Sequence, residues 1–218
     1  TVGSFIAIYL DGEELVSSTT SGSFTTDSEN TTIGSRLSDR YFDGKISKPQ
    51  LWDRVLSPTK ITALYNESSS PKDSLKFELP LVYDYSGNGN TWYDLSGNGL
   101  DAQLQNGVPW VDENGGTMTF DGTNDQAVVL DNSLLDFPAD FTIEGAVIKQ
   151  VGGGGWLHRR SSDAERNWVL STTGGNSMWF LIRYSGSWYP PALDTWGGEN
   201  QFTKYNHVVV TRNSGVIN

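Results

Sequence analysis

The amino-acid sequence predicts an all-β fold, an antiparallel β-sandwich, on three observations. Its apolar residues fall into short runs rich in β-branched and aromatic residues, which is typical of strands. Gly, Asn, Asp and Ser separate those runs, which indicates tight turns. The 24 glycines among 218 residues are too many backbone breaks for a helical bundle. A single all-β domain can have this length.

The predicted strands follow in chain order. Residues 5–10 form the first, because Asp11-Gly12 comes directly after them and is typical of a hairpin turn. The same pattern predicts strands at residues 118–120, 127–130, 141–148, 168–170, 178–183 and 208–211. One short helix is expected after Ser57, which can cap it, with Pro58 at its first position.

The charge balance limits the classes of partner. The chain has 26 acidic and 15 basic residues, a formal net charge of -11, which argues against nucleic acid and anionic membranes. It has no cysteine, which excludes a disulfide, a thiol nucleophile and a thiolate metal site. No apolar run reaches the roughly 18 residues that a membrane span needs, so we expect a soluble chain without membrane insertion.

The polar stretch at residues 67–74 contains Pro71 and no apolar residue, so burial cannot offset the entropy of ordering it. We therefore predict a linker over residues 67–79. A local repeat follows it, with YDYSGNG at 83–89 and YDLSGNG at 93–99, and this composition favours turns that expose carboxylate and carbonyl oxygens.

Two sets of motifs resemble laminin-G-like domains of the concanavalin A-like lectin/glucanase superfamily. Residues 92–99 (WYDLSGNG), 104–107 (LQNG) and 120–125 (FDGTND) resemble the opening of such a domain. Residues 8–12 (IYLDG), 41–46 (YFDGKI) and 51–58 (LWDRVLSP) resemble its closing part. The resemblance implies a jelly roll of two antiparallel sheets, with ligand received on a concave face or a rim of loops.

The two parts stand in permuted order, with the closing half at residues 1–66 and the opening half at residues 80–218. Residues 207–215 resemble the strand that precedes the Tyr9-Leu10-Asp11-Gly12 strand in this family, so the end of the chain would lead back to its beginning. Three interpretations stay open: a window on a tandem array, a circular permutant, or halves completed by neighbouring copies. We expect one complete sandwich built from both halves, because unfinished sheets expose unpaired edges.

Aromatic and basic residues are concentrated between residues 156 and 196. Flat aromatic faces stack on sugar rings, while Arg, Asn and His donate hydrogen bonds to hydroxyls, so this mixture favours carbohydrate binding. The alternative is that individual tryptophans, such as Trp168 and Trp179, belong to the core. The predicted ligand-binding residues are Trp156, His158, Arg159, Arg160, Asn167, Arg183, Trp188, Tyr189 and Trp196.

Calcium is the metal that the residues favour, because it takes carboxylate, amide and backbone oxygens. The resemblance to laminin-G-like domains also implies a structural calcium ion. The predicted ligands are Asp94, Asn98, Asp121 and Asp125. The alternative is that these side chains cap turns without a metal.

No catalytic motif stands out. A retaining glycosidase needs two carboxylates on one face, and Glu13 and Glu14 are adjacent, so they would face opposite ways. We therefore expect no enzyme but a carbohydrate-binding or adhesion module on a virus particle or cell surface, with glycans as partners and several copies in an oligomer or array. The alternative is a structural assembly subunit, such as a capsid decoration or fibre protein, whose halves complete one another across copies.

Overall fold

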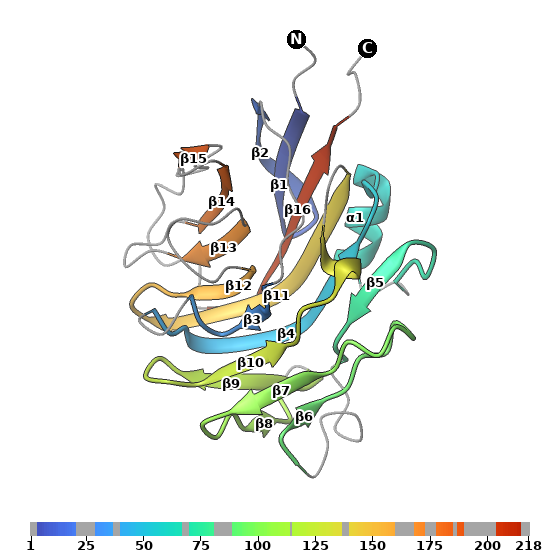
Figure 1. Ribbon diagram of the computed structural model, residues 1–218. Helices are drawn as coiled ribbons and strands as arrows, with labels where there is room; N and C mark the ends of the chain where they lie inside the picture. The colour runs from blue at the N-terminus through green and yellow to red at the C-terminus, as the bar shows by residue number, and fades with distance from the viewer. Residues whose placement is uncertain are drawn as a thin grey trace.

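The computed structural model describes residues 4–20, 29–36, 40–66, 70–80, 89–113, 115–136, 140–159, 168–172, 178–184, 187–189 and 204–214. Strands make up 54% of the structure, arranged as two antiparallel sheets (Figure 1). The predicted all-β sandwich is therefore confirmed. No helix of the described residues is long and apolar enough to cross a membrane.

Sheet A has seven strands in one path, with β5 (Leu75–Glu78) paired to β4 beside it. Their order is β2 (Glu13–Thr20), β1 (Ser4–Leu10), β16 (Asn206–Asn213), β11 (Phe141–Val151), β4 (Asp43–Trp52), β9 (Thr117–Asp121) and β8 (Trp110–Val111). Sheet B has the order β15 (Ser187–Tyr189), β14 (Met178–Tyr184), β13 (Trp168–Thr172), β12 (Gly155–Arg159), β3 (Thr31–Ile33), β10 (Gln126–Val129), β7 (Ala102–Gln105) and β6 (Thr91–Trp92).

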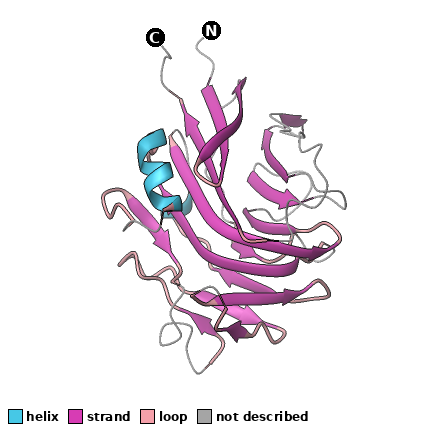
Figure 2. Cartoon of the chain, turned by 180° about the vertical axis from the view of Figure 1, so that it is seen from behind, coloured by secondary structure: helices cyan, strands magenta, loops and turns pink. Residues whose placement is uncertain are grey.

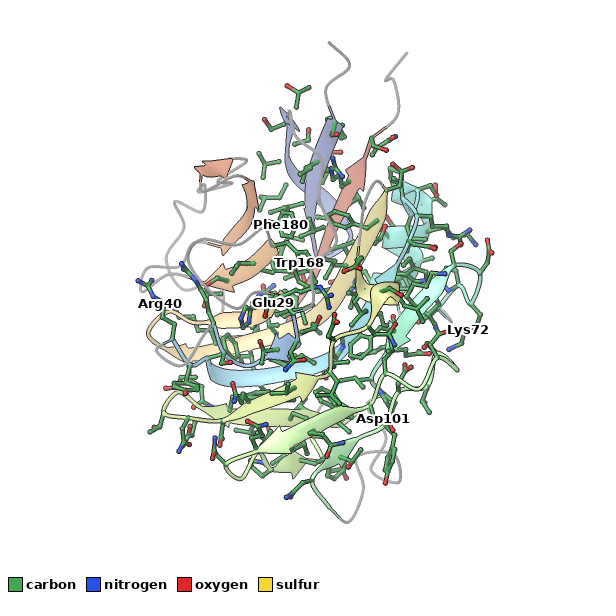
Figure 3. The ribbon with its side chains drawn as sticks, viewed as in Figure 1. Glu29, Arg40, Lys72, Asp101, Trp168 and Phe180 are labelled. Atoms are coloured by element: carbon green, nitrogen blue, oxygen red, sulfur yellow. The ribbon has the colours of Figure 1, made fainter. Side chains whose placement is uncertain are left out.

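The main core lies between the two sheets. Alternation along each strand turns one row of apolar side chains inward, as Ile33 of β3, Ile143 of β11 and Phe120 of β9 show, each at most 1% exposed. Trp168 and Phe180 also lie inside the sandwich (Figure 3). The core alternative for Trp168 is therefore correct.

A second apolar layer covers the outer face of sheet A. Helix α1 (Pro58–Tyr65) packs there, with Ile61 and Leu64 against Trp52 and Val209 (Figure 2). The helix begins as predicted, because the Ser57 hydroxyl accepts a hydrogen bond from the Lys60 amide at 3.4 Å. A short 3-10 turn, η2 (Ser133–Leu135), follows β10.

Strands from the two sequence halves alternate within both sheets. In sheet A, β1 pairs with β16, so that Phe5 lies opposite Asn213. The Asp11 amide donates to the His207 carbonyl at 2.8 Å, and the His207 amide donates to the Asp11 carboxylate at 2.8 Å. In this structure, residues 4–66 and 70–214 thus complete one sandwich within a single chain.

The prediction of a linker over residues 67–79 is wrong for its second part. Residues 75–78 form β5, with Phe77 fully buried and Leu75 6% exposed. The Trp52 indole N–H also donates to the Pro71 carbonyl at 2.8 Å. Pairing with β4 and the burial of Leu75 and Phe77 therefore hold this segment within sheet A.

Candidate ligand-binding face

The candidate site is the outer face of sheet B, the side turned away from sheet A. Leu104 of β7 and Ala127 of β10 point into the core, so their neighbours Gln103, Gln105 and Gln126 lie on the outer face. Figure 1 shows β7, β10 and β3 following one another across this sheet. Gln103 and Gln105 are exposed and Gln126 is half-buried.

Hydrogen bonds fix the amides of this face. The Ser35 hydroxyl donates to the Gln126 amide oxygen at 2.8 Å, and the Gln126 amide nitrogen donates to Gln105 at 2.6 Å. The Thr91 hydroxyl donates to the Gln103 amide oxygen at 3.4 Å. These bonds hold donors and acceptors in set orientations, which lowers the entropic cost of binding a polar ligand.

Acidic residues are absent from the described strands of sheet B. None of those strands, from β15 to β6, contains Asp or Glu. The strands of sheet A contain six, namely Glu13, Glu14, Asp43, Glu78, Asp121 and Glu144. The described strands of sheet B therefore contain no carboxylate, although the chain as a whole is strongly acidic. The period-two patterns of residues 103–105 and 126–129 were the available sequence signal for this face.

Trp156 does not lie on this face. It sits at a bulge in β12, between the paired positions of Gly155 and Leu157, and none of its surface is exposed. Its ring packs toward Gly145 of β11 within the core. The prediction that Trp156 stacks on a sugar therefore does not fit this structure, because a fully buried indole offers no free ring face.

His158 and Arg159 are also buried, at 1% and 2% exposed. Thr32 Oγ1 lies 2.9 Å from Nδ1 and 3.1 Å from Nε2 of His158, on the outer side of sheet B. Arg159 points the other way and donates to Asp131 at 2.7 Å and Asp136 at 2.8 Å. These internal ion pairs give Arg159 a structural role, contrary to the predicted contact with ligand.

Six further predicted ligand residues lie outside the side chains that the structure describes. Arg160, Asn167 and Trp196 lie outside the described residues. Arg183 of β14 and Trp188 and Tyr189 of β15 have described backbone only. In the backbone register, Arg183 lies opposite Trp188, and Tyr189 lies opposite Ile182. Their binding role stays a prediction.

The predicted calcium ligands fall into two pairs at opposite ends of β7. Asp94 and Asn98 precede Ala102, the first residue of β7, whereas Asp125 precedes Gln126, which pairs with the last residue of β7. Three residue steps of strand separate these ends by about 10 Å, while the ligands of one calcium ion lie within about 2.6 Å of it. The four residues therefore do not fit one ion.

Asp94 instead organises its own loop. Its carboxylate accepts from the amides of Glu78 at 3.0 Å, Ser96 at 2.9 Å and Leu100 at 3.0 Å, and from the Ser96 hydroxyl at 2.7 Å. Asn98 donates to the Lys76 carbonyl at 2.9 Å. Both carboxylate oxygens are satisfied by protein donors, which matches the turn-capping alternative.

The second predicted pair, Asp121 and Asp125, lies near Asp43, where the end of β9 pairs with the start of β4. The Thr123 amide donates to Asp121 at 2.8 Å, and this bond holds the pKa of Asp121 below its usual value. Burial and then the Asp121 charge raise the pKa of Asp125 and of Asp43. The described residues contain no group of three or more His, Cys, Asp or Glu side chains that could hold a metal ion.

A comparison with models of protein families gives a match for the first part of the chain. The family model described as the concanavalin A-like lectin/glucanases superfamily, a laminin G model, matches residues 2–62. The two antiparallel sheets of the structure are consistent with this match. The sandwich is concanavalin A-like. No curated protein and no solved structure matches the chain.

The match confirms the resemblance seen in the first part of the sequence. A concanavalin A-like, laminin G-like sandwich indicates a lectin or another binding module, although the superfamily also contains glycosidases. Function in such a fold depends on the side chains that each member carries on its faces and loops. In this concanavalin A-like sandwich, the polar face of sheet B is the described surface that fits a binding role.

Proposed function

We propose that this protein is a non-catalytic carbohydrate-binding and adhesion module whose glycan ligand lies on the outer face of sheet B. The observation that carries the proposal is the neutral, hydrogen-bonding character of that face, with Gln103, Gln105 and Gln126 side by side on β7 and β10. Amide groups donate to and accept from sugar hydroxyls. The fold and the family match support a binding role of this kind.

The aromatic part of the site would come from β14 and β15. In the backbone register, His158 of β12 lies opposite Val169 of β13, and Val169 lies opposite Leu181 of β14. Arg183 comes two residues after Leu181 and therefore belongs to the same face of sheet B. Arg183 lies opposite Trp188, so this end of sheet B brings an arginine position and a tryptophan position together. Stacking by Trp188 and Trp196 on sugar rings, with polar contacts from Arg160, Asn167 and Arg183, completes the proposed site. Tyr189, next to Trp188 in β15 and opposite Ile182, belongs to the other face of the sheet and is left out of it.

The absence of acidic residues from the described strands of sheet B favours binding without cleavage. Canonical glycoside hydrolysis uses two carboxyl groups that flank the scissile bond, about 5 to 9.5 Å apart depending on the mechanism. The described strands of this sheet supply none. This composition of the described strands supports the proposal of binding over cleavage.

We expect low affinity at each site, so adhesion would depend on several copies acting together. We place the protein outside the cell or on the surface of a virus particle, as a homo-oligomer or a repeated array that contacts cell-surface polysaccharide. We keep a structural calcium ion as a proposal that the binding experiment tests. The four predicted ligands do not form one site, so the proposal assigns the ion no ligands.

A glycan array probed with the purified full chain tests the proposal. The double variant Gln103→Ala/Gln105→Ala should lose about tenfold or more in affinity for any bound glycan, because it removes two amides worth about 1 kcal/mol each. Lys60→Ala is the matched control, since Lys60 is exposed on α1 against the other sheet. Parallel arrays with calcium and with a chelator test the metal. A folded chain that binds no glycan, or equal loss in the control, contradicts the proposal.

A structural role in an assembly is the second candidate. The observation that favours it is that strands from the two sequence halves interleave in both sheets, so that neither half has complete sheets of its own. Light scattering on the purified chain separates the candidates. An obligate oligomer that binds no glycan favours assembly, and a glycan-binding monomer favours the lectin.

A further inference from the structure

The first segment of the chain supplies a middle strand to each sheet. In sheet A, β4 lies between β11 and β9, and in sheet B, β3 lies between β12 and β10. Both strands come from residues 4–66, which we call the donor segment. All of their ladder partners come from residues 70–214, which we call the acceptor body.

Neither part has a complete sheet by itself. Within the donor segment, β1 and β2 form a hairpin, and the described pairings give β3 and β4 no partner there. Without the donor segment, β11 and β16 separate from β9 and β8, and β12 to β15 separate from β10, β7 and β6. Each part thus exposes the open strand edges that the other part covers.

The contacts between the two parts are extensive and buried. Eight residue pairs join β4 to β11, and six join β1 to β16. Ile33 and Ile46 of the donor segment are fully buried in the core that both parts share. The covalent connection between the parts is one short stretch from Asn66 to Ser70.

We propose that the donor segment is exchanged between copies, so that β3 and β4 of one chain complete the sheets of a second copy of the same chain. The proposal rests on the second candidate function, a role in assembly. An exchanged copy makes the same strand pairs and the same core contacts as a chain that pairs with its own donor segment. This is because every copy offers the same positions, between β11 and β9 and between β12 and β10. The two states differ in which copy supplies the donor segment and in their dependence on protein concentration.

The different dependence of the two states on protein concentration predicts when exchange occurs. Closure within one chain is first order, whereas exchange needs a second chain, so dilute chains close on themselves. Refolding at high concentration, or assembly of many copies at one surface, favours exchange. Because each chain both donates and accepts, exchange generates closed dimers or open head-to-tail arrays.

An engineered disulfide between the donor segment and the acceptor body tests the proposal, since the chain has no native cysteine. We call the boundary where strands of these two parts pair the seam. The full-length variant Phe5→Cys/Asn213→Cys joins facing positions of β1 and β16, both half-buried. Facing residues of an antiparallel pair have the Cα separation that a disulfide requires. A second seam variant, Thr32→Cys/Val128→Cys, joins β3 to β10 and covers the case in which the first does not fold.

The matched control is Thr91→Cys/Gln103→Cys, a facing pair that lies entirely within the acceptor body. Each variant is refolded at a low and at a tenfold higher protein concentration, oxidised, and analysed by non-reducing electrophoresis and light scattering. The seam variants should give interchain disulfides whose share rises about tenfold with concentration while it is small, because dimer formation is second order. The control should stay intrachain at both concentrations.

Two results overturn the exchange. If a seam disulfide is intrachain in a sample that is oligomeric by light scattering, the assembly role stands and the exchange is excluded. If both seam variants stay monomeric with intrachain disulfides at both concentrations, the exchange and the assembly role fail together.

Discussion

Gly145 of β11 lies directly against the indole of Trp156 on the facing strand β12. A Cβ atom placed on Gly145 would be 3.0 Å from Cζ3 of that ring, closer than ordinary van der Waals contact, and 3.4 Å from Cη2. Trp156 has no exposed surface. The absence of a side chain at residue 145 therefore makes room between the sheets for the largest aromatic residue.

The first prediction is that Gly145→Ala lowers the free energy of unfolding by about 1 to 3 kcal/mol, because the added methyl group overpacks the core against Trp156. Urea denaturation measures it. Gly89→Ala is the matched control, because a Cβ at Gly89 meets nothing within 4 Å. Equal stability changes in the two variants would show that the Gly145 contact does not limit the packing.

The second prediction concerns the buried guanidinium of Arg159, which bridges Asp131 and Asp136. Arg159→Ala should lower the free energy of unfolding by about 3 to 5 kcal/mol, because it leaves Asp136, whose side chain is 10% exposed, without this cation. Asp131→Ala should cost less, since the Asp131 side chain is 40% exposed. Thermal unfolding compares the two. A normal stability of Arg159→Ala combined with lost glycan binding would show that Arg159 contacts the ligand, as the sequence predicts.

Short sequence motifs correctly predict those strands and helices whose ends are set by turn or capping residues next to them in the chain. Asp11-Gly12 marked the end of β1, and Ser57 with Pro58 marked the start of α1. Strand β5 was missed because a polar stretch precedes it, although Leu75 and Phe77 alternate as strand residues do. Its burial depends on β4, which lies more than 20 residues earlier in the chain.

The site residues were harder to predict, because the same residue types suit a binding rim and a sandwich interior. Trp156 is buried by a bulge that shifts its register, and no local pattern marks that bulge. The partners of Arg159 lie 28 and 23 residues away, so its ion pairs follow from the topology alone. Gln103 and Gln105 show the opposite case, since alternation with Ala102 and Leu104 already marks them as one outward row.

The third prediction concerns the Asp94 loop. Asp94→Ala removes the acceptor of four hydrogen bonds that hold the loop between β6 and β7, so the free energy of unfolding should fall by about 2 kcal/mol. A chelator should leave the stability of the native chain unchanged if protein donors alone satisfy this carboxylate. Thermal unfolding with and without calcium measures both effects. A chelator effect as large as that of Asp94→Ala would show that calcium binds in this loop after all.

The last prediction concerns alkaline pH and Tyr9, which lies between the strands of sheet A and helix α1 and is 5% exposed. Burial, and then the charge and hydrogen bond of Glu14, raise the pKa of Tyr9 to about 12. In the unfolded chain the pKa is about 10, so the folded state holds the phenol proton more tightly. The folded state therefore binds more protons between these two values, and the contribution of Tyr9 to stability is complete below pH 10 and is lost as the pH rises toward 12.

Tyr9→Phe removes this titrating group and keeps the ring that packs against α1. The difference in unfolding free energy between the native chain and Tyr9→Phe should be constant below about pH 10 and should then shift in favour of the variant. Chemical denaturation across this range measures the difference, and the variant cancels the titration of every other tyrosine and lysine. A difference that does not change with pH would mean that the Tyr9 hydroxyl reaches solvent and that helix α1 does not seal this part of sheet A.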